Sequence, residues 1–213
     1  MRNSFKWIVG LGFALVSAIA QAQSPVAMVL DVSGDVTLAV QGKQVTVEPF
    51  SRLLDGDRVK LGRDAKLSIV YPRSGRQENW SGVGALITGD SESKAVTGNP
   101  SVEVKQLPTY VAKQMARTPV SDTSGKAGMV RMRAISSPEN LGKLEQQVAQ
   151  MRAETTPDDR SPDIYLLAGL NEMGMTDRIK EELTRLQKAY PADSAVKALT
   201  KAYARSLKDD SAN

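Results

Sequence analysis

The chain contains no cysteine and no histidine. The absence of cysteine excludes a disulfide framework, a thiolate nucleophile and a cysteine-based metal site. The absence of histidine removes the most common general base and the most common protein ligand of zinc, copper and nickel. Catalytic centres of the Ser-His-Asp and Cys-His types are therefore excluded, and we expect a protein that is not an enzyme and that uses no cofactor or metal.

Long apolar runs are also scarce. A single run, WIVGLGFALVSAIA, follows Arg2 and Lys6 and leads into Ala20-Gln21-Ala22. A charged start, a short apolar stretch and a small-x-small site are typical of a secretory signal peptide. The run falls short of the roughly 20 residues of a membrane-spanning helix. We predict a signal peptide over residues 1–22, cleavage after Ala22, a periplasmic location and no integral membrane segment in the mature chain; the alternative is an uncleaved anchor.

Neither sign of charge is in large excess. The whole chain has 28 Lys and Arg against 24 Asp and Glu. Loss of residues 1–22 would remove Arg2 and Lys6, which leaves 26 basic and 24 acidic residues, a net charge of +2. This balance does not favour nucleic acid as a partner.

The stretch from Val26 to Ile87 is strand-like. Short runs such as VTLAV, KQVTV, DRVKL and KLSIVY alternate apolar and polar residues, ENWSGVGALITG adds one more apolar run, and turns rich in Gly, Asp and Ser separate them. Such runs, repeated at intervals of roughly ten residues, are typical of an all-β domain. We predict this domain over residues 23–105, as a sandwich or a short solenoid of antiparallel-type strands. Residues 91–100 read as a polar, turn-rich loop, and SVEVKQL as the final strand.

The aspartates of the turns admit three interpretations. The carboxylates of Asp55, Asp57 and Asp64 could supply the oxygen ligands of a calcium site. The residues after Asp55, however, do not follow the spacing of an EF-hand loop. Asp55 with Asp57, or Asp35 with Asp90, would be the acid/base pair of a carboxylate-based hydrolase. Aspartates at turn tips are solvated, however, and lack the burial that tunes a catalytic pKa. We favour turn chemistry, because Asp side chains bond to their own backbone in tight turns.

Residues 106–136 are predicted to be a basic connector. PTYVAKQMART indicates a short helix from Pro108, and MVRMRAI indicates an extra strand. A solvated linker explains the excess of positive charge in this region, and contact with anionic lipid or cell-wall polymer is the alternative. Between Val104 and Ala134, six basic residues oppose the single acidic Asp122: Lys105, Lys113, Arg117, Lys126, Arg131 and Arg133.

Residues 137–208 are predicted to form four helices, with a frayed tail at 209–213. Each helix carries one apolar stripe on an otherwise charged surface, so each must pack against a neighbour. Two starts place Ser at the N-cap and Pro at the first helical position. The four predicted starts are Ser137-Pro138, Ser161-Pro162, Thr176-Asp177 and Asp193.

The segment from Val32 to Ile87 resembles the FecR domain. The matching elements are Gly34-Asp35-Val36, Leu54-Asp55-Gly56-Asp57-Arg58-Val59, Gly62 with Asp64-Ala65, and KLSIVY. FecR domains are periplasmic all-β modules, and in the name-giving proteins one lies behind a membrane helix and a cytoplasmic anti-sigma segment and senses a TonB-dependent receptor. We expect no cytoplasmic segment in this chain, and residues 72–76 replace the family's usual Asp-Gly-Ser-like turn. The resemblance therefore implies a binding module rather than sigma-factor control.

The segment from Ile164 to Tyr203 is similar to a tetratricopeptide repeat, with Gly174 as the turn glycine and Pro191 as the terminal proline. Ile179 takes the place of the small residue that is usual at its position. One repeat and a following helix are too few for a solenoid, since stable arrays need about three repeats. The resemblance implies a small helical bundle, in which a repeat-like groove would hold a peptide.

Trp80 is the aromatic residue that the sequence offers for binding. It follows Arg73 and Arg76, and an aromatic ring beside basic groups suits a sugar, peptidoglycan or an acidic protein surface; a core position is the favoured alternative. The basic residues Lys113, Arg117, Arg131 and Arg133 complete the candidate partner-binding set.

These observations predict a non-catalytic periplasmic scaffold or sensor that recognises another cell-envelope protein. The alternatives are a module that binds a cell-wall polymer or carbohydrate and, less favoured, a carboxylate-based hydrolase.

Overall fold

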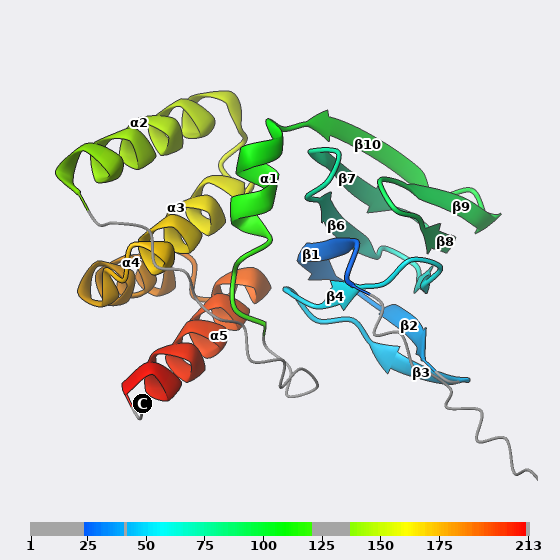
Figure 1. Ribbon diagram of the computed structural model, residues 1–213. Helices are drawn as coiled ribbons and strands as arrows, with labels where there is room; N and C mark the ends of the chain where they lie inside the picture. The colour runs from blue at the N-terminus through cyan, green and yellow to red at the C-terminus, as the bar shows by residue number, and fades with distance from the viewer. Residues whose placement is uncertain (1–23, 41, 121–136, 212–213) are drawn as a thin grey trace, which may run out of the picture.

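The structure, a computed structural model, describes residues 24–40, 42–120 and 137–211. Within these residues the chain forms antiparallel β-sheets followed by helices, so the predicted α+β class is confirmed (Figure 1). The predicted signal peptide and the predicted strand in MVRMRAI lie outside the described residues. In the described part of the chain, no helix is both long and apolar enough to cross a bilayer.

The strands form two five-stranded antiparallel sheets. The inner sheet has the order β10-β7-β6-β1-β4, and the outer sheet has the order β3-β2-β5-β8-β9. The strands are β1 Ala27–Ser33, β2 Val36–Val40, β3 Lys43–Thr46, β4 Arg52–Leu53, β5 Arg58–Leu61, β6 Lys66–Tyr71, β7 Arg76–Ser81, β8 Gly84–Thr88, β9 Ser93–Gly98 and β10 Ser101–Gln106.

The two sheets pack face to face around one apolar cluster, as the sandwich alternative predicts. The inner sheet contributes Val29 and Ile69 to this cluster, and the outer sheet contributes Val59 and Leu86. Residues in β5 alternate strictly between buried and exposed, as expected for a strand with one buried face.

The inner sheet buries its second face against the helices. Ala27 to Leu30 in β1 are four consecutive buried residues. Met28, Leu30 and Val70 belong to the cluster that contains the helix residues, whereas Val29 belongs to the sandwich cluster. The sheets and the helices therefore share the inner sheet as a common layer, with a core on each side of it.

The five helices are α1 Thr109–Met115, α2 Pro138–Glu154, α3 Ser161–Glu172, α4 Thr176–Ala189 and α5 Ser194–Ser211. Helix α3 is the central one, because every residue from Ser161 to Leu170 is buried. It packs against α1, α2 and α4. Helix α5 lies against β1 and continues past residue 208, where we predicted the frayed tail to begin.

Two of the predicted helix caps form. Ser137 accepts a hydrogen bond from the Asn140 amide at 3.2 Å, and Asp193 accepts one from the Val196 amide at 3.1 Å. The predicted cap at Ser161 is wrong. Ser161 lies inside α3, and its own amide donates to Asp159 Oδ1 at 2.8 Å. The carboxylate two residues earlier accepts this amide in place of a Ser hydroxyl, and an ionised acceptor makes the stronger bond.

The β-domain differs from the prediction in two places. ENWSGVGALITG is two strands, β7 in the inner sheet and β8 in the outer sheet, because the chain turns at Gly82 with φ of 90°. Residues 91–100 are not only a loop, because they contain β9. At the aspartate turns, Asp57 Oδ2 accepts the Leu54 amide at 2.8 Å and Gly56 has φ of 82°. This geometry confirms turn chemistry there.

Candidate functional site

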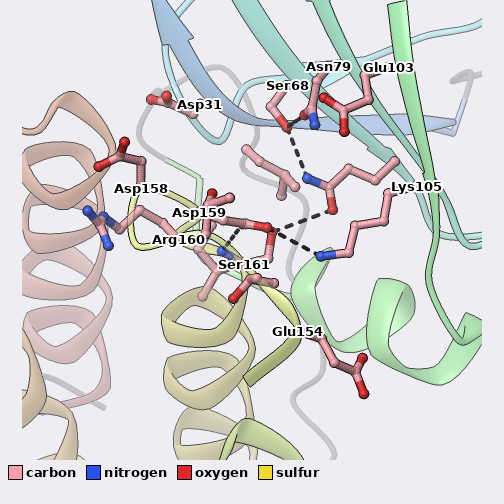
Figure 2. Close-up of a pocket in the computed structure, with 15 residues that line it drawn as sticks. Asp31, Ser68, Asn79, Glu103, Lys105, Glu154, Asp158, Asp159, Arg160 and Ser161 are labelled. Atoms are coloured by element: carbon pink, nitrogen blue, oxygen red, sulfur yellow. Dashed lines mark hydrogen bonds and ion pairs between the residues drawn. The ribbon is translucent and has the colours of Figure 1, made fainter. Parts of the chain in front are cut away.

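A groove lies on the helix side of the inner sheet, beside the connection between α2 and α3 (Figure 2). It consists of two hollows of about 360 Å³ and about 380 Å³ that share four lining residues. The shared residues are Asp31, Ser68, Asn79 and Glu103. They come from β1, β6, β7 and β10, so the groove crosses four adjacent strands. We call it the polar groove, and it is the candidate site.

The strand register explains the polar floor of this groove. Asp31 pairs with Ser68, Ser68 pairs with Asn79, and Asn79 pairs with Glu103. Residues directly opposite each other in a sheet point to the same face. The four side chains therefore form a single row across the sheet, with an acid at each end and a hydroxyl and an amide between them.

Hydrogen bonds hold the middle of the row in place. Ser68 Oγ donates to Asn79 Oδ1 at 2.8 Å, and Gln77 Nε2 donates to Ser68 Oγ at 3.3 Å. The oxygen of the Gln77 amide faces the Ser161 hydroxyl at 3.5 Å, at the start of α3. The floor is thus tied to the helical layer by hydrogen bonds.

The α2–α3 connection, residues 155–160, forms one wall. Arg160 anchors it: its Nε lies 2.8 Å from Asp193 Oδ2, its Nη1 donates to the Pro157 carbonyl at 2.9 Å, and its guanidinium lies 3.6 Å from the centre of the Tyr190 ring. Burial alone would lower the pKa of Arg160, but the hydrogen bond and charge of Asp193 raise it above its ordinary value. Arg160 therefore stays charged, and the carboxylate of Asp193 neutralises its charge.

Two further contacts connect the groove to the rest of the fold. Figure 2 shows Lys105 extending from β10 toward Asp159, and their charged atoms are 3.4 Å apart. On the opposite side, Ser194 Oγ donates to Asp31 Oδ1 at 3.0 Å at the start of α5. Residues far apart in the sequence thus meet at one site.

The groove is acidic overall. Within the described residues, the side chains of Glu103 and Asp158 have neither an ion pair nor a hydrogen bond, and both residues are exposed. Since Lys105 already faces Asp159 and Arg160 faces Asp193, most of the positive charge near the groove is compensated. Its carboxylates are Asp31, Glu103, Glu154, Asp158 and Asp159, and its cations are Lys66, Lys105 and Arg160.

Trp80 and Arg76 share a partner, because both bond to the buried carboxylate of Glu78. Trp80 is 4% exposed, and its Nε1 donates to Glu78 at 2.9 Å. Arg76 Nε lies 2.6 Å from the other oxygen of Glu78, which is fully buried, and the Ser93 amide of β9 also donates to this carboxylate at 3.1 Å. The structure thus places Trp80 in the core position that the sequence favours, within a network that joins the two sheets.

The other basic candidates lie apart from the polar groove. Arg73, in the β6–β7 turn, faces Asp90 at 2.6 Å, and Arg117, after α1, pairs with Glu172. Lys113 is exposed on α1. Arg131 and Arg133 lie outside the described residues. The described candidates therefore do not form one surface.

Two buried tyrosines lie in the apolar cores, Tyr71 in the sandwich cluster and Tyr165 in the cluster with the helices. Burial raises the pKa of Tyr165 to about 12. Burial also raises the pKa of Tyr71, against the opposing effect of its hydrogen bond with Ser93 at 2.6 Å. Both rings therefore stay neutral over the physiological range.

Sequence reasoning did not find the polar groove. Its residues come from β1, β6, β7, β10 and the α2–α3 connection, and only the strand register brings them together. One signal was present, because Ser68 is a polar residue within the otherwise apolar segment LSIVY.

The chain matches no protein-family model, no curated protein and no solved structure. The resemblances to the FecR domain and to the tetratricopeptide repeat rest on the motifs given above. Function must therefore be inferred from the chemistry of the polar groove.

Proposed function

We propose that this protein is a non-catalytic binding module of the cell envelope whose polar groove holds an extended, basic segment of another envelope protein. In this proposal the chain is exported, its sandwich is a FecR-like domain, and its helices are a tetratricopeptide-like bundle. The basic partner segment would lie along the row of polar side chains from Asp31 to Glu103.

The acidic lining is the observation that supports this proposal most directly. Glu103 and Asp158 are exposed carboxylates with no partner in the described part of the chain. A groove with an excess of one sign of charge attracts segments of the opposite sign and concentrates them. The amide and hydroxyl of Asn79 and Ser68 supply hydrogen-bonding groups for a peptide backbone.

The same observation disfavours an anionic wall polymer as the ligand. A negative groove repels such a polymer, and the ring of Trp80 is too buried to stack on a sugar. Carbohydrate binding and hydrolysis are therefore kept as the alternatives that the experiments below distinguish from peptide binding.

Fluorescence anisotropy with labelled oligolysine and oligoglutamate peptides tests the proposal. We expect oligolysine to bind, with an affinity that falls as salt rises, and oligoglutamate not to bind. Combining Asp158→Asn with Glu154→Gln should weaken oligolysine binding roughly fivefold, since exposed pairs each contribute a fraction of a kcal/mol. The control combines Asp177→Asn with Glu181→Gln, because it removes the same two charges from exposed positions on α4 outside the groove.

Equal binding of both peptides, or an equal loss in the control variant, would refute the proposal. Sedimentation of the protein with purified peptidoglycan would favour the wall-polymer alternative. Release of soluble fragments from that peptidoglycan would favour the hydrolase.

A further inference from the structure

The β10 strand is an open sheet edge. All of its residues are exposed except Lys105, which is half-buried, and it pairs with β7 in unbroken register from Ser101 to Gln106. Its second edge has no strand partner among the described residues. Val102 and Val104 are 39% and 43% exposed although they point toward the sandwich side, like their pairing partners Trp80 and Glu78. Figure 1 shows β10 at the margin of the inner sheet.

The other edges of the described sheets are protected in recognised ways. Proteins blunt exposed edges with short strands, lysines and bulges. Strand β4 has only two residues, and β3 has four residues and begins with Lys43. Strand β9 contains Lys94 and a register shift against β8. Among these four edges, β10 is the longest that pairs without a bulge.

The backbone groups on the open edge can be assigned from the ladder. The Leu107 amide donates to the Gly75 carbonyl at 2.8 Å, so residue 107 points toward β7. Backbone direction alternates along a strand. The amide and carbonyl groups of Val102, Val104 and Gln106 therefore point outward, away from β7.

The sequence of this edge, Ser-Val-Glu-Val-Lys-Gln, is complementary to itself when reversed. If Val104 lies opposite its own counterpart, Glu103 lies opposite Lys105 and Lys105 lies opposite Glu103. Both charged pairs then fall at positions without backbone hydrogen bonds, where opposing side chains are closest. The Val104 pair falls at an outward-pointing position, where two backbone hydrogen bonds form.

We infer that two copies of this chain associate through antiparallel pairing of their β10 strands, about a two-fold axis at Val104. The two inner sheets then form one continuous ten-stranded sheet. Lys105 of each copy faces Asp159 of its own chain at 3.4 Å and now also faces Glu103 of the partner subunit. This match of charged positions is the argument for a second copy as the occupant of the edge. The polar groove of each copy ends at β10, so pairing brings the two grooves edge to edge.

The interface involves one strand from each copy, so we expect affinity in the micromolar range, as for small interfaces. Sedimentation velocity of the full protein over a concentration series measures it. Glu103→Lys or Lys105→Glu alone places two like-charged pairs across the axis and should weaken the dimer about tenfold, because symmetry counts each change twice. The double variant Glu103→Lys with Lys105→Glu restores opposite charges and should recover the dimer.

Val104→Pro tests the backbone pairing. Its amide points outward, so proline in both copies removes the two hydrogen bonds at the axis without breaking the ladder to β7. We expect a monomer with an unchanged far-ultraviolet circular dichroism spectrum. Lys94→Glu on β9 is the control and should leave the dimer intact.

A protein that stays monomeric at high micromolar concentration would overturn the inference. A dimer that survives both Glu103→Lys and Val104→Pro would also overturn it, because its interface would lie elsewhere. Failure of the double variant to recover a dimer lost in the single variants would exclude this register.

Discussion

The two sheets of this protein differ in how many faces they bury. The inner sheet is covered by the outer sheet on one side and by helices on the other, whereas the outer sheet buries only its sandwich face. In β1, Ala27 to Leu30 are buried without interruption, while in β5 Val59 and Leu61 are buried and Arg58 and Lys60 are exposed. A continuous apolar run therefore marks the strand that lies between two layers, and strict alternation marks the strand that faces solvent.

This difference shows that the β and helical parts share one core layer and do not form two separate modules. Met28 and Val29 are neighbours in sequence, yet they belong to different apolar clusters. Substitutions on either face of the inner sheet should therefore lower the free energy of unfolding more than a substitution on the exposed face of the outer sheet.

The largest effect is expected from Glu78→Ala. This buried carboxylate of the inner sheet accepts hydrogen bonds from Trp80, Arg76 and the Ser93 amide of the outer sheet. Its removal leaves the Arg76 charge and two buried donors without this acceptor, so we expect a loss of about 3–5 kcal/mol in the free energy of unfolding. Chemical denaturation measures it. Glu78→Gln keeps an acceptor and should cost less; an equal cost would show that the retained acceptor oxygen does not stabilise the network.

Met28→Ala tests the helix-facing side of the inner sheet. Met28 is fully buried in the cluster with the helices, and we expect a loss of about 3 kcal/mol from the missing contacts and the cavity. Helix ellipticity and Trp80 fluorescence should report one shared, lowered transition, since sheet and helices unfold together. A helical transition that moves while the Trp80 transition does not would contradict the common layer.

High pH should destabilise the protein through its buried tyrosines. Burial raises the pKa of Tyr165 from 10.0 to about 12, so its stabilising contribution is complete below pH 10 and is lost as pH rises from 10 to 12. We expect this tyrosine to account for about 2–3 kcal/mol of that loss. Denaturation at pH 9 and pH 12 measures it, and Tyr165→Phe should flatten the dependence. An unchanged slope in that variant would show that Tyr165 is not responsible.

The smallest effect is expected on the exposed face of the outer sheet. Lys60 points away from the sandwich, next to the buried Val59. Lys60→Ala should change the free energy of unfolding by less than about 0.5 kcal/mol, as is usual for surface positions. A loss as large as that of Met28→Ala would mean that this face is also covered.

The sequence supported prediction of the elements better than of their arrangement. Alternation and turn glycines identify most strands, and Ser137 and Asp193 mark real helix caps. Strand β9 was missed because its residues are exposed beyond Ser93, so no buried face imposes a period-two pattern. The polar groove could not be predicted, since it depends on pairings such as Asp31 with Ser68 and Asn79 with Glu103, which local patterns do not encode.

The contact between β1 and α5 constrains how the chain can fold. Ser194, at the start of α5, donates to both Asp31 Oδ1 and the Val32 carbonyl, across a sequence separation of more than 160 residues. During synthesis, β1 emerges long before the helix that lies against it. Its helix-facing residues Met28 and Leu30 therefore remain uncovered in the nascent chain until the C-terminal region is made. Contacts this distant slow folding and prolong exposure to aggregation, so the nascent chain should depend on a chaperone more than a protein with two separate modules would.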